Sequence, residues 1–136
     1  MKKYKIELTE YQLHILENAV EKQSRNIVGQ LDIGIKDICY NAIKRHYPEL
    51  RTYYDRIELN EKAKDLINQL HCLCWNQIPN ASYGVKYSEE SDTLIDIHEV
   101  IRHFLYKERG DTSMTVDGDK PFHWNKDVEL IKIEKV

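Results

Sequence analysis

The segment from Leu94 to Arg109 constrains the fold most strongly, because its apolar residues recur at the spacing of a helix. They define a single stripe that consists of Leu94, Ile97, Ile101, Phe104 and Leu105. A helix with one such stripe buries it against another element, so the pattern predicts an amphipathic helix that packs in a core. Gly110 follows the segment and is expected to end the helix.

Four other side chains form a ridge beside this stripe: His98, Arg102, Tyr106 and Arg109. At about 100° per residue they fall within an arc of roughly 80°. Two guanidinium groups and two rings on one ridge have the chemistry to bind a ligand that carries both phosphate and a base. The alternative is a set of solvated helix charges, in which Arg109 only complements the negative end of the helix dipole.

Six further residues are candidates for the same ligand site. Met114, Thr115 and Asp117 follow the helix, and a thioether can lie against a base while a carboxylate accepts hydrogen bonds from ribose hydroxyls. Asp117 with Gly118 is equally well explained as a hairpin turn. The other candidates lie near the end of the first expected helix and in the loop before the last one: Arg25, Gln30 and Tyr83. They would reach this pocket if the two helices pack antiparallel, although a tyrosine in that loop could also simply cap the core.

The remaining pattern predicts three more helices. Thr9 and Gln12 have capping-box spacing, Asn60 is a good N-cap, and Ser88 or Ser91 can cap the last helix. The expected helices cover about residues 10–28, 32–45, 61–75 and 94–109. Gly29 is expected to end the first of them.

Strands are expected near both ends of the chain. Residues 3–8 alternate between apolar and charged side chains, and residues 114–119 and 127–136 are rich in turn or β-branched residues. The first and last segments could then pair with each other. The predicted fold is therefore α+β, a small antiparallel sheet with three to four long helices in a single domain of residues 1–136.

Composition narrows the functional classes. The net charge of −3 argues against non-specific binding to duplex nucleic acid, which depends on many phosphate contacts. The N-terminus does not resemble a signal peptide, and no stretch approaches the ~20 apolar residues that cross a bilayer. Three cysteines cannot all pair within one chain, which fits a reducing compartment. We expect a cytoplasmic protein that binds neither nucleic acid nor membrane.

Metal binding and catalysis have weak support. His71, Cys72 and Cys74 invite a zinc interpretation, but the two cysteines are closer together than the usual ligand pair and no second cysteine pair exists. The motifs of common nucleophilic and phosphate-binding sites do not occur. Glu99 and His103 are four residues apart on the last helix, a spacing that is common on solvated helices. We expect no metal, no cofactor and no catalytic site.

Several segments resemble the type I Thoeris anti-defence family of phages and prophages: YKIELTEYQLHILENAVE, RNIVGQ, IPNASYG, IHEVIRHFLYKERG and MTVDGDKP. The resemblance implies a homo-oligomer built from dimers that binds a cyclic ADP-ribose isomer tightly without cleaving it. Such a sponge would deprive a host immune effector of its signal. Under this resemblance Arg102 and Arg109 would meet the phosphates, and Thr115 and Asp117 the ribose side.

Two other functional classes remain open. One is a helical phage accessory protein that inhibits a host protein through a tyrosine-rich surface, since nine tyrosines against two phenylalanines favour wet interfaces. The other is a small nucleotide-processing enzyme that uses His98, His103 or Glu99. A sponge gains nothing from stabilising a transition state, so it needs only a preformed pocket and slow release.

Overall fold

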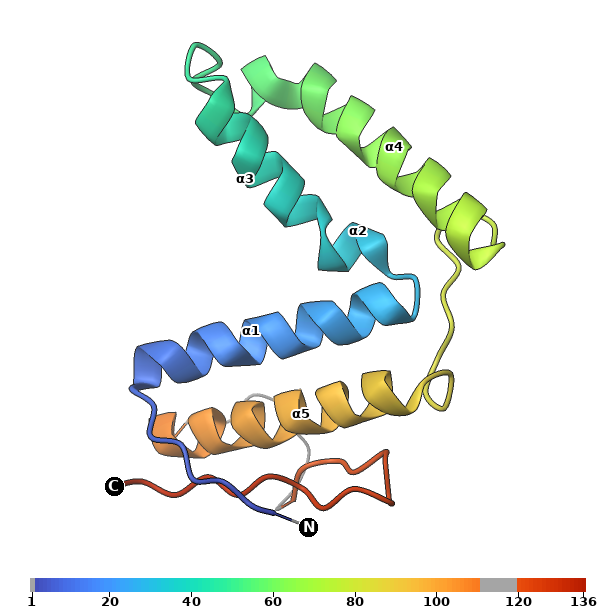
Figure 1. Cartoon of the computed structure of the whole chain (residues 1–136). Coiled ribbons are helices and arrows are strands. Elements are labelled where there is room, and N and C mark those ends of the chain that lie inside the picture. The colour runs from blue at the N-terminus through green and yellow to red at the C-terminus, as the bar shows by residue number, and fades with distance from the viewer. Residues whose placement is uncertain (1, 111–119) are drawn as a thin grey trace.

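The computed structural model of the chain describes residues 2–110 and 120–136. Figure 1 shows α1 and α5 side by side, with a hairpin of α3 and α4 projecting from this pair and the two terminal segments running along α5. The helices of the described residues are α1 (Glu10–Ile27), α2 (Leu31–Gly34), α3 (Lys36–His46), the 3-10 helix η1 (Tyr54–Arg56), α4 (Ile57–Trp75) and α5 (Glu89–Arg109). None of them is both long and apolar enough to cross a membrane.

Helix α1 begins and ends where its sequence predicts. The Thr9 hydroxyl accepts a hydrogen bond from the Gln12 amide at 3.2 Å, and the Gln12 side chain accepts one from the Thr9 amide at 2.9 Å. This reciprocal pair is the predicted capping box, which satisfies two amides that the first turn leaves without partners. At the other end Gly29 takes a φ of 85°, so the predicted end of the helix is also confirmed.

The packing of α1 on α5 forms the main core. The two helices run antiparallel (Figure 1) and bury Val20 of α1 together with Ile101 and Leu105 of α5. Near one end, Ser24 and Ser91 exchange hydrogen bonds through their hydroxyl groups and each other's carbonyl oxygens, at 2.9 to 3.2 Å. Both serines are buried, and their small side chains allow the two backbones to approach closely at this end.

Helix α5 is covered on a second side by the C-terminal segment. Gly110 ends it at a φ of 61°, which confirms the predicted end. Of the two serines considered as caps Ser88 is the N-cap, and the helix begins at Glu89, five residues before the expected start. Asp96 is buried, and its two carboxylate oxygens accept hydrogen bonds from the amides of Trp124 at 2.6 Å and Asn125 at 2.9 Å. The buried carboxylate thus attaches an irregular segment to the helix, because these amides have no ladder partner of their own.

The predicted second and third helices need correction. The segment expected to form one helix over 32–45 is divided at Ile35 into α2 and α3. Asn60 is not an N-cap, since it is buried inside α4, which begins three residues earlier. Helix α4 itself has no side-chain cap and follows directly on η1. The capping signal lies before η1, where the side chains of Thr52 and Asp55 each form a hydrogen bond with the other residue's backbone amide, at 2.9 and 3.1 Å.

The predicted α+β fold is wrong, because the described residues form helices and contain no strand. The terminal segments do lie close together, as the Lys3–Glu129 ion pair at 2.5 Å shows, but they are not joined in a sheet. Their alternation lacks a layer to cover it: Tyr4 and Ile6 are 84% and 77% exposed. A two-stranded ribbon without a buried face is marginal in water, so the pattern alone does not produce a sheet. The expected strand at 114–119 lies outside the described residues.

The Lys3–Glu129 pair gives the contact between the terminal segments a pH dependence. A hydrogen bond and the nearby charge of Lys3 hold the pKa of the Glu129 carboxyl below its usual range. A lowered pKa in the folded state means that the contact is present above the ordinary glutamate pKa and is lost as pH falls through the folded value. Both side chains are exposed, so the effect on global stability is small.

We predict that Asp96→Asn lowers the free energy of unfolding by about 1.5–3 kcal/mol, because an amide nitrogen would replace one acceptor that now faces a backbone N–H. Urea denaturation followed by circular dichroism measures the change. Asp127→Asn is the matched control, since Asp127 is exposed on the same segment and should change stability by less than about 0.5 kcal/mol. Equal unfolding midpoints for both variants would contradict the role of Asp96.

Candidate functional site

The predicted ridge of α5 lies along the first half of α1. His98 is buried between the helices, with its ring nitrogens 3.8 Å from carboxylate oxygens of Glu17 and Glu99. It is therefore part of the interhelical contact. Tyr106 is half-buried and lies about one helical turn before the exposed Arg109.

The two arginines of the ridge differ in exposure. Arg102 is half-buried and lies 3.5 Å from the Glu99 carboxylate. Arg109 is exposed, and its Nη2 lies 2.6 Å from Nε2 of His14 on α1. Because a guanidinium only donates, His14 Nε2 is the acceptor in this contact. Arg109 is thus held at the N-terminal end of α1 and remains open to solvent.

The other three described candidates meet at the opposite end of α1. Arg25 donates to Glu21 at 2.9 and 3.0 Å and to the Gln30 side-chain oxygen at 2.6 Å. Gln30 in turn donates to the Ser82 hydroxyl at 3.0 Å. This series of contacts fixes a guanidinium whose side chain is still 33% exposed. It also connects the end of α1 to the loop before α5.

Tyr83 completes this group. Its backbone amide donates to the Val28 carbonyl at 2.9 Å, and its ring stacks on Tyr87 with centroids 4.2 Å apart and planes 13° apart. Both rings are partly exposed, the Tyr83 hydroxyl donates to the Trp75 carbonyl at 3.3 Å, and their loop is joined to the fixed guanidinium through Ser82 and Gln30. We call this group the α1 corner; it consists of Arg25, Gln30, Ser82, Tyr83 and Tyr87.

One subunit does not bring all the predicted site residues together. Arg25 is in the last turn of α1, whereas the contact of Arg109 is with His14 near its start. At 1.5 Å per residue these positions are about 16 Å apart along the helix. The candidates therefore form two groups, the α1 corner and the exposed end of the ridge. Met114, Thr115 and Asp117 lie outside the described residues.

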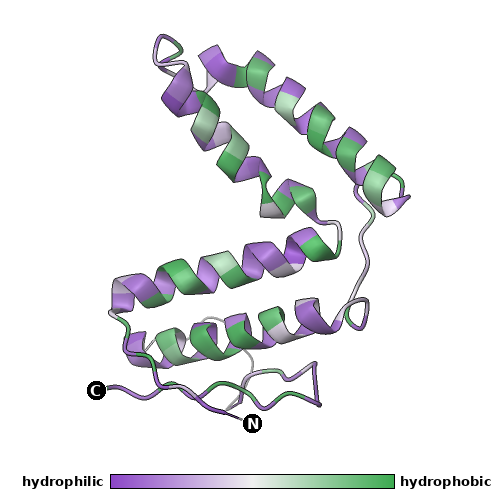
Figure 2. Cartoon of the chain, in the orientation of Figure 1, coloured by the Kyte–Doolittle hydropathy of each residue, from purple (hydrophilic) through white to green (hydrophobic). Residues whose placement is uncertain are grey.

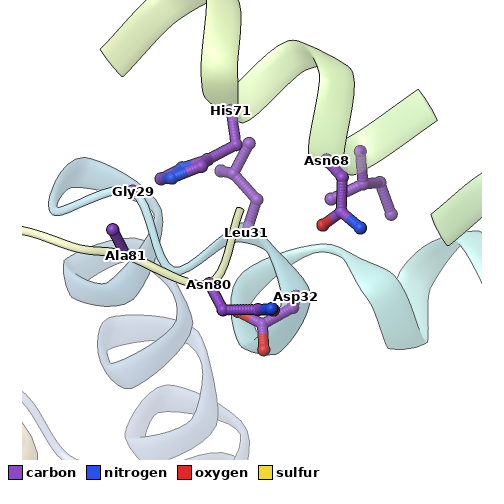
Figure 3. Close-up of a pocket in the computed structure, with 8 residues that line it drawn as sticks. Gly29, Leu31, Asp32, Asn68, His71, Asn80 and Ala81 are labelled. Carbon is purple, nitrogen blue, oxygen red and sulfur yellow. The ribbon is translucent and has the colours of Figure 1, made fainter. Parts of the chain in front are cut away.

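Sequence reasoning missed a cavity next to the α1 corner. It is a small hollow with room for about one water molecule and opens to solvent, between the α1–α2 turn, α4 and the loop at Asn80. Figure 3 shows His71 and Asn68 descending from α4 toward Leu31, with Asn80 and Asp32 on the other side. His71 is only 4% exposed, and neither of its ring nitrogens has a hydrogen-bond partner. Nothing in the sequence indicated that His71 lines a cavity. Its neighbours Cys72 and Cys74 suggested a metal ligand instead.

The walls of the cavity are fixed by close packing. His71 stacks on Trp75 with centroids 6.1 Å and planes 16° apart, and the indole N–H donates to the Ile27 carbonyl at 3.0 Å. The backbone of Gly29 packs closely against the rings of His71 and Trp75. A Cβ there would lie 3.0 Å from carbon atoms of each ring, at a φ that side chains rarely adopt. The turn after α1 therefore needs glycine for two independent reasons.

The three residues weighed as zinc ligands differ in environment. His71 is buried and stacked, Cys72 is half-buried and Cys74 is exposed. In the described part of the chain no three histidine, cysteine or carboxylate side chains are grouped so that they could hold a metal ion. The histidine therefore contributes to the cavity and not to a cluster with its neighbours.

Comparison of the chain with protein-family models, with curated proteins and with solved structures finds no match. The functional inference therefore depends on the residues and their geometry. Two features are available for it: the fixed, partly exposed guanidinium of the α1 corner and the polar cavity beside it.

We predict that Gly29→Ala lowers the free energy of unfolding by at least about 1–2 kcal/mol, because the new Cβ meets His71 and Trp75 at a strained φ. Gly84→Ala is the matched control: its Cβ would meet nothing within 4 Å. It should leave stability unchanged or raise it slightly by restricting the unfolded chain. Thermal unfolding followed by circular dichroism compares the two. A Gly29→Ala protein as stable as the control would show that this turn is not packed as described.

Proposed function

We propose that this protein is a phage anti-defence protein that sequesters a cyclic ADP-ribose-type signal nucleotide in the host cytoplasm, without cleaving it, and so blocks Thoeris immunity. The observation that carries the proposal is the α1 corner. There a guanidinium is fixed by Glu21 and Gln30, and Gln30 joins it through Ser82 to the loop that carries two stacked, partly exposed tyrosine rings. A ligand of this class carries a pyrophosphate, two riboses and an adenine, so it needs both a cation and an aromatic face.

Fixed geometry suits capture. A guanidinium held in advance by Glu21 and Gln30 loses little side-chain freedom when a phosphate binds, which favours tight binding and slow release. Glu21 offsets part of the charge of Arg25, so further cations are needed for two phosphates. The exposed Arg109 at the far end of α5 is the candidate for that role.

We propose that Arg109 of a second copy of the chain lies close to Arg25 of the first. The chain exposes 10262 Å², whereas a folded monomer of its 16.2 kDa mass exposes about 7,500 Å². The excess of roughly 2,800 Å² is more than the ~1,000–2,500 Å² that one subunit of a typical obligate homodimer buries, so a second copy could cover much of it. Antiparallel pairing of two α1·α5 layers would place Arg109 of one subunit beside the α1 corner of the other.

The exposed apolar residues of the hairpin also support assembly. Figure 2 shows apolar segments along both α3 and α4. On α4, Leu66, Leu70 and Leu73 share one face at helical spacing and are 64%, 45% and 81% exposed. This leucine stripe is distinct from the buried face that contains Ile67. The same stripe favours the runner-up, a helical accessory protein that inhibits a host protein by direct binding.

We predict that Leu66→Glu or Leu73→Glu lowers the solution mass toward that of one chain, because a charge in an apolar contact between copies is strongly unfavourable. Light scattering coupled to size exclusion measures the mass. Lys64→Glu changes an exposed residue on a different face of α4 and should leave the mass unchanged. A wild-type protein that is already monomeric at micromolar concentration would refute assembly by a second copy.

Capture without cleavage is tested by incubating the protein with a cyclic ADP-ribose isomer, then measuring free nucleotide before and after heat denaturation. The proposal predicts depletion followed by release of the intact nucleotide. A modified product would support the nucleotide-processing enzyme instead. No depletion by any isomer would favour the protein-inhibiting alternative and contradict the sponge.

We predict that Arg25→Ala and Arg109→Ala each lower nucleotide affinity by tenfold or more, since hydrogen bonds to charged groups contribute ~1.5–3 kcal/mol. Calorimetric titration gives the dissociation constants. Arg51→Ala is the matched control, because Arg51 is an exposed arginine at the far end of the hairpin and should not affect binding. Unchanged affinity in either of the first two variants would remove that arginine from the site.

A further inference from the structure

The loop that connects α4 to α5 (Figure 1) contains a strained backbone position. Among the described residues, the positions other than glycine with a positive φ are Asn76, Asn80 and Lys86, and all three lie in this loop. Asparagine adopts the left-handed conformation more readily than most residues, so two of the three positions are ordinary. Lysine has no such preference, and its φ of 70° is strained. A strained residue persists where its surroundings hold it in place.

The carboxylate of Asp92 holds Lys86 in this conformation. Both of its oxygens accept from the Lys86 amide, at 3.0 and 3.1 Å. Asp92 lies in the first turn of α5 and is only 7% exposed, so this acceptor is a buried carboxylate. The charge strengthens the hydrogen bond, and the positive end of the helix dipole stabilises the charge. The contact with Asp92 therefore offsets the strain at Lys86.

Residues 82–87, which we call the strap, lie on the surface between this contact and the end of α4. All six residues are exposed. Near the start of the strap, the Tyr83 amide and hydroxyl donate to the carbonyls of Val28 and Trp75, at 2.9 and 3.3 Å. Near its end, the Lys86 amide donates to Asp92. A segment that is held by exposed hydrogen bonds and buries no side chain opens at a lower free energy than the core.

The strap also contacts the residues that fix Arg25. The Ser82 hydroxyl accepts from Gln30 at 3.0 Å, and the Gln30 side-chain oxygen accepts from Arg25 at 2.6 Å. Opening the strap breaks the contact between Ser82 and Gln30 and separates the two tyrosine rings from the guanidinium. A ligand that binds Arg25 and also contacts the strap is therefore released when the strap opens.

We propose that the strap is a lid, which opens as one unit to admit a ligand to the α1 corner and closes on it, and that Asp92 is the positioning residue of the closed state. The strain at Lys86 favours opening, and the Asp92 carboxylate opposes it. The balance between these two residues sets how long a ligand stays bound. The identity of that ligand as a signal nucleotide rests on the proposed function, whereas the opening of the strap does not.

Amide hydrogen exchange, followed by NMR on the full chain without ligand, tests the lid. The Tyr83 and Lys86 amides should have protection factors within about threefold of each other, because one opening exposes both. Both should be at least about tenfold less protected than the amide of Leu105, which is 5% exposed in the core of α5. Unequal protection of the two strap amides, or protection equal to that of Leu105, would overturn the lid.

Two variants shift the opening in opposite directions. Lys86→Gly should raise the protection of both strap amides about threefold, because glycine adopts this φ without strain. Lys126→Gly is the matched control, since Lys126 is an exposed lysine without a positive φ, and it should leave both amides unchanged. Asp92→Ala should lower the protection of both amides about tenfold, because a hydrogen bond to a charged group is lost. Unchanged protection in Lys86→Gly, an exposed substitution that keeps the fold, would contradict the proposal.

The release rate of a cyclic ADP-ribose isomer, measured by stopped-flow displacement, gives a second readout. Lys86→Gly should slow release about threefold and Asp92→Ala should accelerate it about tenfold, in step with the exchange data. Coupled exchange of the two strap amides without capture of any nucleotide would retain the lid and refute the sponge. Capture with uncoupled amides, or with release rates unchanged in both variants, would retain the sponge and refute the lid.

Discussion

The close antiparallel packing of α1 on α5 is the contact from which the rest of the arrangement follows. Ser24 and Ser91 are buried and satisfy each other reciprocally, which fixes how the two helices are aligned along their length. A bulkier side chain at either position would separate the backbones, and an apolar one would remove that residue's hydrogen bond to the opposite carbonyl. With this alignment set, the end of α1 meets the loop before α5, and the exposed Arg109 is carried to the opposite end.

This alignment explains why the polar groups of the chain fall into separate regions. The α1 corner contains a cation and two rings, whereas the lining of the cavity behind it includes a carboxylate and two carboxamides. A phosphate requires positive charge, so the corner suits it and the cavity does not. The large exposed area and the leucine stripe of α4 indicate that the isolated chain lacks part of its natural contacts.

Most helices could be predicted from local sequence signals. The features that could not be predicted, such as the absence of a sheet and the role of His71, depend on contacts between residues far apart in the chain. The capping box at Thr9 and the glycine at 110 act within one turn, so sequence alone placed the ends of α1 and α5. The sheet failed because alternation produces strands only where another layer covers one face. Asn60 was misplaced because the chain already turns into helix upstream, through the Thr52–Asp55 pair and η1, and α4 continues from η1. The role of His71 depends on a turn more than forty residues away, which no spacing pattern reports.

The most direct measurement is a crystal structure of the full chain with a cyclic ADP-ribose isomer. We predict an intact, unmodified nucleotide whose phosphate oxygens lie within hydrogen-bond distance of the Arg25 guanidinium, with its base on the ring of Tyr83. Arg109 from the same or a second copy is expected within reach of the other phosphate. Guanidinium tips that point into bulk solvent, with the nucleotide absent or bound elsewhere, would contradict the account.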